Sequence, residues 1–329
     1  MVELNLRKYF TPAAIVDTLG RLPKLSTPIM DLLFSDERFI PRALIGVRDF
    51  GFDPVNIPVV MRGTQSHPLT GSGGKLEYIE PQPVNPSEFI SGADLKNLRD
   101  ANESNVQQEI DNFVERLRRA CRKTSEALAI QSLTGEINYW MKGAGGVLEP
   151  YKVTYGTIGD ASAKVTKKFD AEGAKISDVV KAVAGILEVL KARKVDGNDV
   201  SIFCAFDVFA VLCDIAGAQS NAAVATATAE GISIGGGFNI KLLASTYTNL
   251  SSKAAIPVVP AKHLLIVDKQ AGHKMIYAGL DSMDSDQQAL PFFVTHETSK
   301  DPSGVKIIAE TKPLPVVNVA GIVKAQVLT

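Results

Sequence analysis

The longest regular pattern of apolar positions in the chain runs from about residue 103 to residue 133. Apolar side chains recur there mostly at steps of three and four residues, which is typical of a helix with one buried face: Val106, Ile110, Phe113, Leu117, Cys121 and Leu128. Gly135 follows as the expected left-handed stop. At 1.5 Å per residue the helix is about 46 Å long, and a compact globule of this chain length is roughly 50 Å across. The pattern therefore predicts a spine helix that crosses nearly the whole molecule, and a flat or elongated shape.

The residues before this helix have no comparable pattern. Residues 1–46 mix short apolar clusters with prolines, which predicts an arm that packs on another surface, with a short helix that begins at Pro12 after Thr11 as N-cap. Residues 55–62 alternate like a strand, and residues 75–80 form a second candidate strand after a stretch rich in turn residues. An isolated two-stranded ribbon is only marginally stable in water. We therefore expect a long hairpin that lies against another surface, such as a neighbouring subunit.

Shorter elements follow the spine helix. The expected elements, in order, are a strand over 151–155, an amphipathic helix with Ser177 as N-cap, a buried strand over 200–206, a helix capped by Asp207 that runs through Ile215, an Ala- and Gly-rich loop over 216–237, and strands over 240–243, 263–267 and 274–277. Helices and strands alternate irregularly rather than as a βαβ series, so the predicted fold class is α+β.

Composition and charge narrow the classes of function. The chain of 329 residues is 45% hydrophobic and 22% charged, with a formal net charge of −1, so it lacks the basic excess of a protein that wraps nucleic acid. Its three cysteines form no C-x-x-C pair, and its four histidines show no metal-ligand spacing, so we expect neither a metal nor a cofactor. A signal peptide and a run of about 18 apolar residues are both lacking, which predicts a soluble protein that remains in the cytoplasm and has no membrane partner.

One short motif raises the possibility of catalysis. Gly231-Ile-Ser233-Ile-Gly235 matches the G-x-S-x-G nucleophile elbow of serine hydrolases, and His263, His273 and His296 lie downstream. An elbow needs a buried strand before the serine and a helix after it, whereas Gly236 and Gly237 are a poor helix start. A Gly-rich loop is the favoured interpretation, with a serine hydrolase that uses Ser233 as the alternative.

A dense basic group lies on the spine helix: Arg116, Arg118, Arg119, Arg122 and Lys123. One interpretation is a contact with nucleic acid or with acidic groups of a neighbouring subunit. The favoured one is a solvated face with ion pairs at i,i+4 spacing, from Glu115 to Arg119 and from Arg122 to Glu126.

The order of these elements resembles the major capsid proteins of tailed phages, and specifically the lambda-like capsid protein E family with its Hong Kong 97-type fold. The residues that carry the resemblance are 78–81 (YIEP), 84–86 (VNP), 127–135 (ALAIQSLTG), 176–180 (ISDVV), 200–208 (VSIFCAFDV), 277–279 (YAG), 291–294 (PFFV), 301–302 (DP) and 312–317 (KPLPVV). The similarity covers most of the chain and is loose over residues 1–46.

The resemblance implies a division of the chain into an N-terminal arm (1–46), an extended E-loop hairpin (47–92), the spine helix and peripheral domain (93–174), an axial domain (175–270), and closing strands of the peripheral domain (271–329). It also implies a major capsid protein, not an enzyme, that assembles through pentamers and hexamers into an icosahedral shell enclosing phage DNA. The expected inter-subunit contacts are Val59, Met61, Tyr78, Arg116, Arg119, Gly235 and Gly236.

The same resemblance implies partners and a location. The expected partners are other copies of the chain, scaffolding and portal proteins, a decoration protein, and packaged DNA contacted without sequence specificity. The expected location is the virion capsid, after assembly in the host cytoplasm. A nanocompartment shell built from the same fold is a further alternative.

Overall fold

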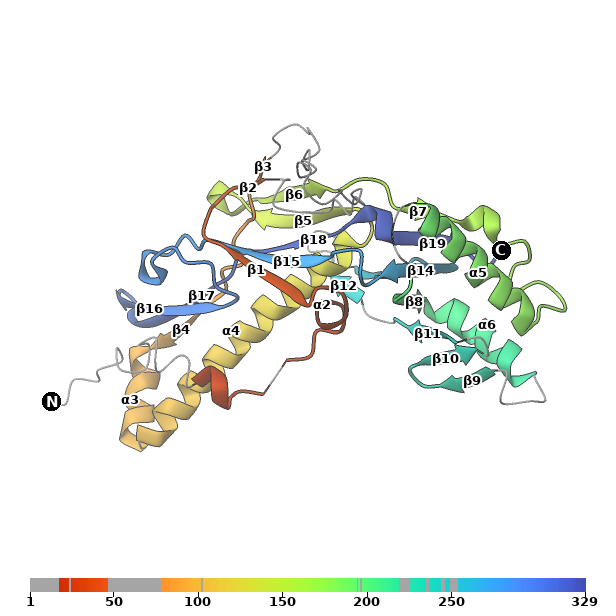
Figure 1. Ribbon diagram of the computed structural model, residues 1–329. Coiled ribbons are helices and arrows are strands. Elements are labelled where there is room, and N and C mark those ends of the chain that lie inside the picture. The colour runs from red at the N-terminus through yellow and green to blue at the C-terminus, as the bar shows by residue number, and fades with distance from the viewer. Residues whose placement is uncertain are drawn as a thin grey trace, which may run out of the picture.

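The computed structural model describes residues 18–23, 25–46, 78–101, 103–193, 195, 197–218, 225–234, 237–243, 246–248 and 254–329. Figure 1 shows an elongated molecule with two halves. In one half, helix α4 (Glu103–Ser132) runs beneath small sheets, and in the other a large sheet carries α5 (Ile176–Ala192) and α6 (Phe206–Gly217). This arrangement confirms the α+β class and the elongated shape that the spine helix predicts.

Helix α4 has the predicted position and length. Its 30 residues span about 45 Å at 1.5 Å per residue. Of the predicted stripe, Ile110, Leu117, Cys121 and Leu128 are buried and Phe113 is partly buried. Val114, which the prediction does not include, is also buried. Gly135 adopts a φ of +91°, and a Cβ there would lie 2.3 Å from the carbonyl oxygen of Gly156. Glycine is therefore required where the chain turns back from the end of α4.

An antiparallel sheet of three strands packs against the first half of α4. Its order is β16 (Phe293–Lys300), β17 (Ser303–Glu310) and β4 (Ser87–Ser91), and α3 (Gly92–Ala101) connects β4 to α4. Ile90, Val305 and Ile307 from this sheet bury themselves against Ile110 and Leu117 of α4. Burial of each such aliphatic side chain stabilises the fold by about 1.5–3 kcal/mol.

A second small sheet lies over the other half of α4. It consists of β1 (Asp36–Ile40), parallel to β15 (Lys274–Ala278), with β18 (Pro313–Val316) antiparallel on the far side. A ribbon of β5 (Glu136–Lys142) and β6 (Leu148–Thr154) covers it (Figure 1), and β6 includes residues 151–154 of the predicted strand 151–155. Val153 and Ile137 of the ribbon share a core with Ile276 and Leu314 of the sheet.

The prediction that residues 1–46 pack on another surface is wrong for residues 25–46. Helix α2 (Pro28–Leu33) buries Ile29, Met30 and Leu33 in a core with Tyr277, and β1 pairs with β15 along its whole length. The apolar clusters in this segment are too short to show a helical period in the sequence. The six residues of α2 nevertheless place three apolar side chains on the face that packs against the body. The helix expected at Pro12 lies outside the described residues; residues 18–21 are helical.

The other half of the molecule is a seven-stranded mixed sheet. Its order is β7 (Gly159–Asp160), β19 (Ile322–Gln326), β14 (His263–Asp268), β8 (Val200–Cys204), β11 (Phe238–Leu242), β10 (Gly231–Ile234) and β9 (Ala225–Thr228). Helices α5 and α6 share its core, in which Ile186, Leu212, Ile202 and Ile266 are fully or nearly fully buried. The strands predicted over 240–243 and 263–267 are confirmed as β11 and β14. The strand predicted over 200–206 is confirmed as β8 but ends at Cys204, and the one predicted over 274–277 is β15 of the three-stranded sheet.

Three local predictions in this half are wrong. Residues 225–234 form the hairpin β9–β10 at the edge of the sheet instead of a loop, because Ile232 and Ile234 bury their side chains in the core that the sheet shares with α5 and α6. Helix α5 begins at Ile176, not after Ser177, since the Asp178 carboxylate accepts the backbone N–H of Lys175. Asp207 is the second residue of α6 and accepts the N–H of Lys262, so it joins the helix to a neighbouring loop.

The predicted hairpin of residues 47–92 lies largely outside the described residues, including its strand over 55–62. At its base, β2 (Ile45–Gly46) pairs antiparallel with β3 (Tyr78–Ile79), and further on Val84 bridges to Thr311. Residues 78–91 therefore pair with strands of the same chain, contrary to the prediction that they depend on another surface. The remaining short elements are β12 (Thr246–Thr248), β13 (Ala255–Pro257), η3 (Ala144–Gly146), η4 (Ser162–Lys164), η5 (Met283–Ser285) and η6 (Val319–Gly321).

Candidate functional site

The basic face of α4 is held by ion pairs within the chain. Arg116 makes a forked contact with Glu88 of β4, with nitrogen–oxygen distances of 2.7 Å and 3.0 Å, and its guanidinium lies 4.4 Å from the ring centroid of Phe113. Hydrogen bonding to Glu88 raises the pKa of Arg116. About half of the Arg116 side chain remains exposed, so the pair contributes at most about 1 kcal/mol to stability and leaves the arginine accessible.

Of the two predicted i,i+4 pairs, one is confirmed and one is wrong. Arg119 pairs with Glu115 as the spacing predicts. Arg122 instead donates to the Thr27 hydroxyl at 2.8 Å and to Asp31 at 3.2 Å. The helical spacing identified Glu126 as a partner, but tertiary packing brings a better-placed acceptor beside Arg122.

Glu126 has a different role, at the start of α2. Its two carboxylate oxygens accept the backbone N–H groups of Ile29 at 2.8 Å and Met30 at 3.0 Å, which a helix start otherwise leaves unpaired. Burial raises the pKa of Glu126, and these two N–H groups partly offset that rise. The carboxylate therefore attaches the segment before β1 to the spine helix.

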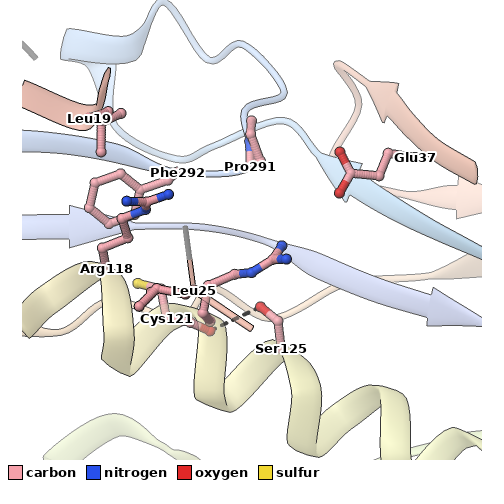
Figure 2. A pocket seen from close by; sticks show the side chains of 9 residues that line it. Leu19, Leu25, Glu37, Arg118, Cys121, Ser125, Pro291 and Phe292 are labelled. Carbon is pink, nitrogen blue, oxygen red and sulfur yellow. Dashed lines mark hydrogen bonds between the residues drawn. The ribbon is translucent and has the colours of Figure 1, made fainter. Parts of the chain in front are cut away.

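A hollow of about 290 Å³ opens between α4 and the segments on either side of it (Figure 2). Four separate parts of the chain line it, namely Leu19 and Leu25 from the N-terminal region, Glu37 from β1, Arg118, Cys121, Arg122 and Ser125 from α4, and Pro291 and Phe292 before β16. The lining is mostly apolar, with two guanidinium groups and one carboxylate. Its volume is just below the range of about 300–1,000 Å³ of small-molecule sites.

The hollow holds no activated nucleophile. Burial raises the pKa of the Cys121 thiol to about 12, so the thiol stays protonated at neutral pH. The Ser125 hydroxyl donates to the carbonyl oxygen of Cys121 at 3.0 Å (Figure 2). Arg118 donates to the carbonyl oxygen of Pro23 at 3.4 Å. An apolar hollow with arginines suits the side chain of a partner better than it suits a reaction. Sequence patterns could not show this hollow, since its lining residues Leu19 and Phe292 are 273 positions apart in the chain.

The other expected contact residues divide into two groups. Tyr78 on β3 is 56% exposed, and Arg119 on α4 has a side chain that is 54% exposed, so both are accessible. Val59, Met61, Gly235 and Gly236 lie outside the described residues. The expected role of all seven as inter-subunit contacts remains a prediction.

The geometry of Ser233 excludes a nucleophile elbow. Ser233 lies inside β10, paired with Thr226 on one side and Asn239 on the other, and not at a strand-to-helix turn. His263 is on β14, three strand positions away, which corresponds to about 14 Å. A Cβ on Gly231 would lie 2.5 Å from the Ile240 carbonyl oxygen, so the first glycine of the motif is explained by the close approach of β11. The serine-hydrolase alternative, which requires Ser233 at a strand-to-helix turn, is therefore wrong.

The described histidine, cysteine and acidic side chains lack a metal-binding arrangement. Within the described part of the chain, no group of three His, Cys, Asp or Glu side chains is placed to hold a metal ion. His273 is not a surface residue, because its side chain is buried and burial lowers its pKa to about 4. Among the helices that the structure describes, none combines the length and the apolar character needed to cross a bilayer.

Comparisons with known proteins agree on one family and one fold. The model of the family described as phage major capsid protein E matches residues 11–327. No curated protein matches the chain significantly. A solved structure of the proposed capsid protein of a prophage of E. coli CFT073 superposes with a TM-score of 0.60 at 15% identity, over 96% of this chain and 98% of that one.

A phage-related protein from Bordetella bronchiseptica RB50 has a TM-score of 0.51 at 10% identity, with 95% of each chain covered. At these low identities the likenesses show the fold alone. The fold is the Hong Kong 97-type capsid fold that the order of elements implied.

Proposed function

Because the chain belongs to the phage major capsid protein E family and is a capsid protein, we propose that its copies assemble through pentamers and hexamers into an icosahedral shell that encloses phage DNA. The observation that carries this proposal is the match of the family over residues 11–327, nearly the whole chain, rather than over one motif. The proposal therefore rests on the whole chain and not on any single residue.

The form of the subunit supports assembly. Large apolar side chains remain exposed on several different elements: Phe39, Tyr78, Val147, Leu148, Phe206 and Met283. Single exposed apolar residues are ordinary. Their distribution over both halves of an elongated molecule suits a subunit that contacts several neighbours at once, because each neighbour buries a different part of it.

We assign roles to the parts of the chain on the same basis. Residues 47–92 form the E-loop, whose last strand, β4, joins a small sheet of the body. Helix α4 and the other strands of the small sheets form the peripheral domain, and the seven-stranded sheet forms the core of the axial domain at the centres of the capsomers. The partners are other copies, scaffolding and portal proteins, and a decoration protein. Packaged DNA contacts the inner surface without sequence specificity, and the shell forms in the host cytoplasm before it becomes part of the virion.

The experiment is expression of the full chain, with and without a scaffolding protein, followed by light scattering and negative-stain electron microscopy. We expect rings of five or six subunits and closed shells. A monodisperse monomer under all of these conditions would contradict the proposal. Nuclease-protected DNA inside shells recovered from infected cells distinguishes a phage capsid from a nanocompartment, whose shells enclose an enzyme.

A further inference from the structure

Three connections carry the described chain between the two halves of the molecule. Residues 155–158 link β6 to β7, residues 269–273 link β14 to β15, and residues 317–321 link β18 to β19 (Figure 1). Each connection joins a strand of the seven-stranded sheet to a strand of the other half. The orientation of the halves relative to each other therefore depends on how these short segments are held.

Arg193 joins the first of these connections to the third. It is the C-cap residue of α5, and its guanidinium donates to the carbonyl oxygens of Thr157 at 3.1 Å, Val319 at 3.0 Å and Ala320 at 3.2 Å. A guanidinium presents its donors in a rigid planar fork, so these bonds define the position of both connections relative to α5. All three acceptors are uncharged backbone groups, so the contact does not depend on the ionisation of a carboxylate.

Asn318 joins the second connection to the third. Its side-chain N–H donates to the Ala271 carbonyl oxygen at 3.0 Å, and its backbone N–H donates to Nδ1 of His273 at 3.3 Å. Its side-chain oxygen accepts the N–H of Ala320, a residue that Arg193 also binds, at 3.1 Å. Two side chains thus tie the three connections to one another.

A shared apolar core also joins the halves. Phe203 and Leu265 of the seven-stranded sheet bury their side chains in one cluster with Tyr277 of the small sheet. Burial of apolar surface favours contact but no particular direction, whereas a hydrogen bond weakens steeply as its angle departs from linearity. The core therefore holds the halves together, and the hydrogen bonds of the connections restrict their orientation.

We propose that the three connections form a hinge between the halves and that Arg193 is the positioning residue that sets its angle. Arg193 acts through the backbone of residues 157, 319 and 320. The consequence for assembly rests on the proposed function. Subunits that share one fixed angle build shells of uniform curvature, and subunits whose angle varies do not.

The first experiment measures the angle in the unassembled subunit. Spin labels are attached to Lys123→Cys on α4 and Lys181→Cys on α5, two exposed positions in different halves, and pulsed electron paramagnetic resonance gives the distribution of distances between them. Cys213 is partly exposed and is replaced by serine in every protein. Burial raises the pKa of Cys121 and of Cys204 to about 12, so these two thiols stay unlabelled.

The wild-type side chain at position 193 should give a narrow distribution. Arg193→Ala should widen the distribution at least twofold, and Arg193→Lys, which keeps the charge but lacks the fork, should widen it less. The matched control is Lys191→Ala, which removes an exposed positive charge from the last turn of the same helix and should leave the width unchanged. If Arg193→Ala fails to fold, the comparison of Arg193→Lys with the control decides. Equal widths for all folded proteins, even with a lowered urea midpoint, would overturn the proposal.

The second experiment compares shells by negative-stain electron microscopy. Wild-type shells should have one diameter, and Arg193→Ala should give shells of varied diameter or shells that fail to close. If wild-type protein never assembles, the proposed function fails, while the distance distribution still tests the hinge. If Arg193→Ala widens the distribution and its shells keep the wild-type diameter, the link between the hinge and shell curvature is refuted.

Discussion

The carboxylate of Glu126 on α4 lies 2.8 Å from the backbone nitrogen of Ile29 and accepts its N–H. This single residue joins the spine helix to a segment 97 positions earlier in the chain. Because the second carboxylate oxygen accepts the Met30 N–H, the first turn of α2 depends on Glu126 in the way that other helices depend on a capping side chain.

Replacement of Glu126 by alanine should therefore destabilise the subunit. Two N–H groups lose their acceptor in a partly buried site, at a cost of about 1–3 kcal/mol. Glu115→Ala, which breaks the exposed pair with Arg119, is the control and should change stability by less than about 0.5 kcal/mol. Urea unfolding of the unassembled subunit measures both, and equal midpoints for the two variants would refute the capping role.

Gly135→Ala should destabilise the subunit more than Gly145→Ala. Both glycines have a positive φ, +91° and +79°, and a side chain in this region costs about 1–2 kcal/mol. At Gly135 the added Cβ also meets the Gly156 carbonyl oxygen, whereas at Gly145 nothing lies within 4 Å. Comparison of the two unfolding midpoints separates the clash from the conformational cost. A similar loss at both positions would show that the end of α4 can shift.

Stability should fall as the pH falls below 6.5 because of His273. Its pKa of about 4 in the folded chain lies below its ordinary value of 6.5, so the unfolded chain binds more protons between these limits. The contribution is fully present above pH 6.5 and decreases by about 2 kcal/mol between pH 7 and pH 5. His273→Gln should remove this decrease, and His263→Gln should preserve it. Urea midpoints at pH 7 and pH 5 provide the measurement, and identical pH dependence of all three proteins would contradict the prediction.

Arg119→Glu tests one of the expected inter-subunit contacts. The side chain is 54% exposed, so reversal of its charge should leave the urea midpoint of the subunit almost unchanged, within about 0.5 kcal/mol. The yield of shells should nevertheless fall severalfold if, as we propose, another copy covers the surface that carries this charge. Lys181→Glu, an exposed reversal on α5, is the control. Equal yields from the two variants would remove Arg119 from the contact surface.

No covalent link between subunits is expected at Asn318. A link to a lysine such as Lys75 would need the side-chain amide of Asn318. The Asn318 amide nitrogen donates to the Ala271 carbonyl oxygen at 3.0 Å and its oxygen accepts the Ala320 N–H at 3.1 Å, so both ends of the amide have local partners. Boiled shells should give a single band on a denaturing gel. A ladder of multimers that disappears in Asn318→Ala would contradict this expectation.

The parts of the fold that the sequence predicts well are those with a long internal period. Ile110, Leu117 and Cys121 repeat over enough turns that only a helix explains them, and α4 follows within one residue of its expected bounds. The hairpin β9–β10 has little local signature, because Ala225 and Thr226 favour a strand only weakly. Its strands depend on the burial of Ile232 in a core that the sheet and two helices form from distant segments. Such burial is a property of the tertiary structure.

The candidate site shows the same limit. Helical spacing correctly pairs Glu115 with Arg119, since both partners lie on one helix. It fails for Arg122, whose acceptors Thr27 and Asp31 come from a segment more than 90 positions away. The hollow beside Arg118 has no local sequence signature, because Leu25 and Phe292 come together only in the folded chain.

The two-residue pairing of β2 with β3 has a consequence for variation among related shells. Ile45 lies opposite Ile79, so the described residues on either side of 47–77 meet at one point of the subunit. Between two ends held together in this way, doubling the length of an inserted flexible segment costs only about 0.6 kcal/mol of closure entropy. Insertions and grafted epitopes at this point would therefore leave the folding of the subunit almost unaffected, and the size of this segment can diverge between lineages while the spine stays constant.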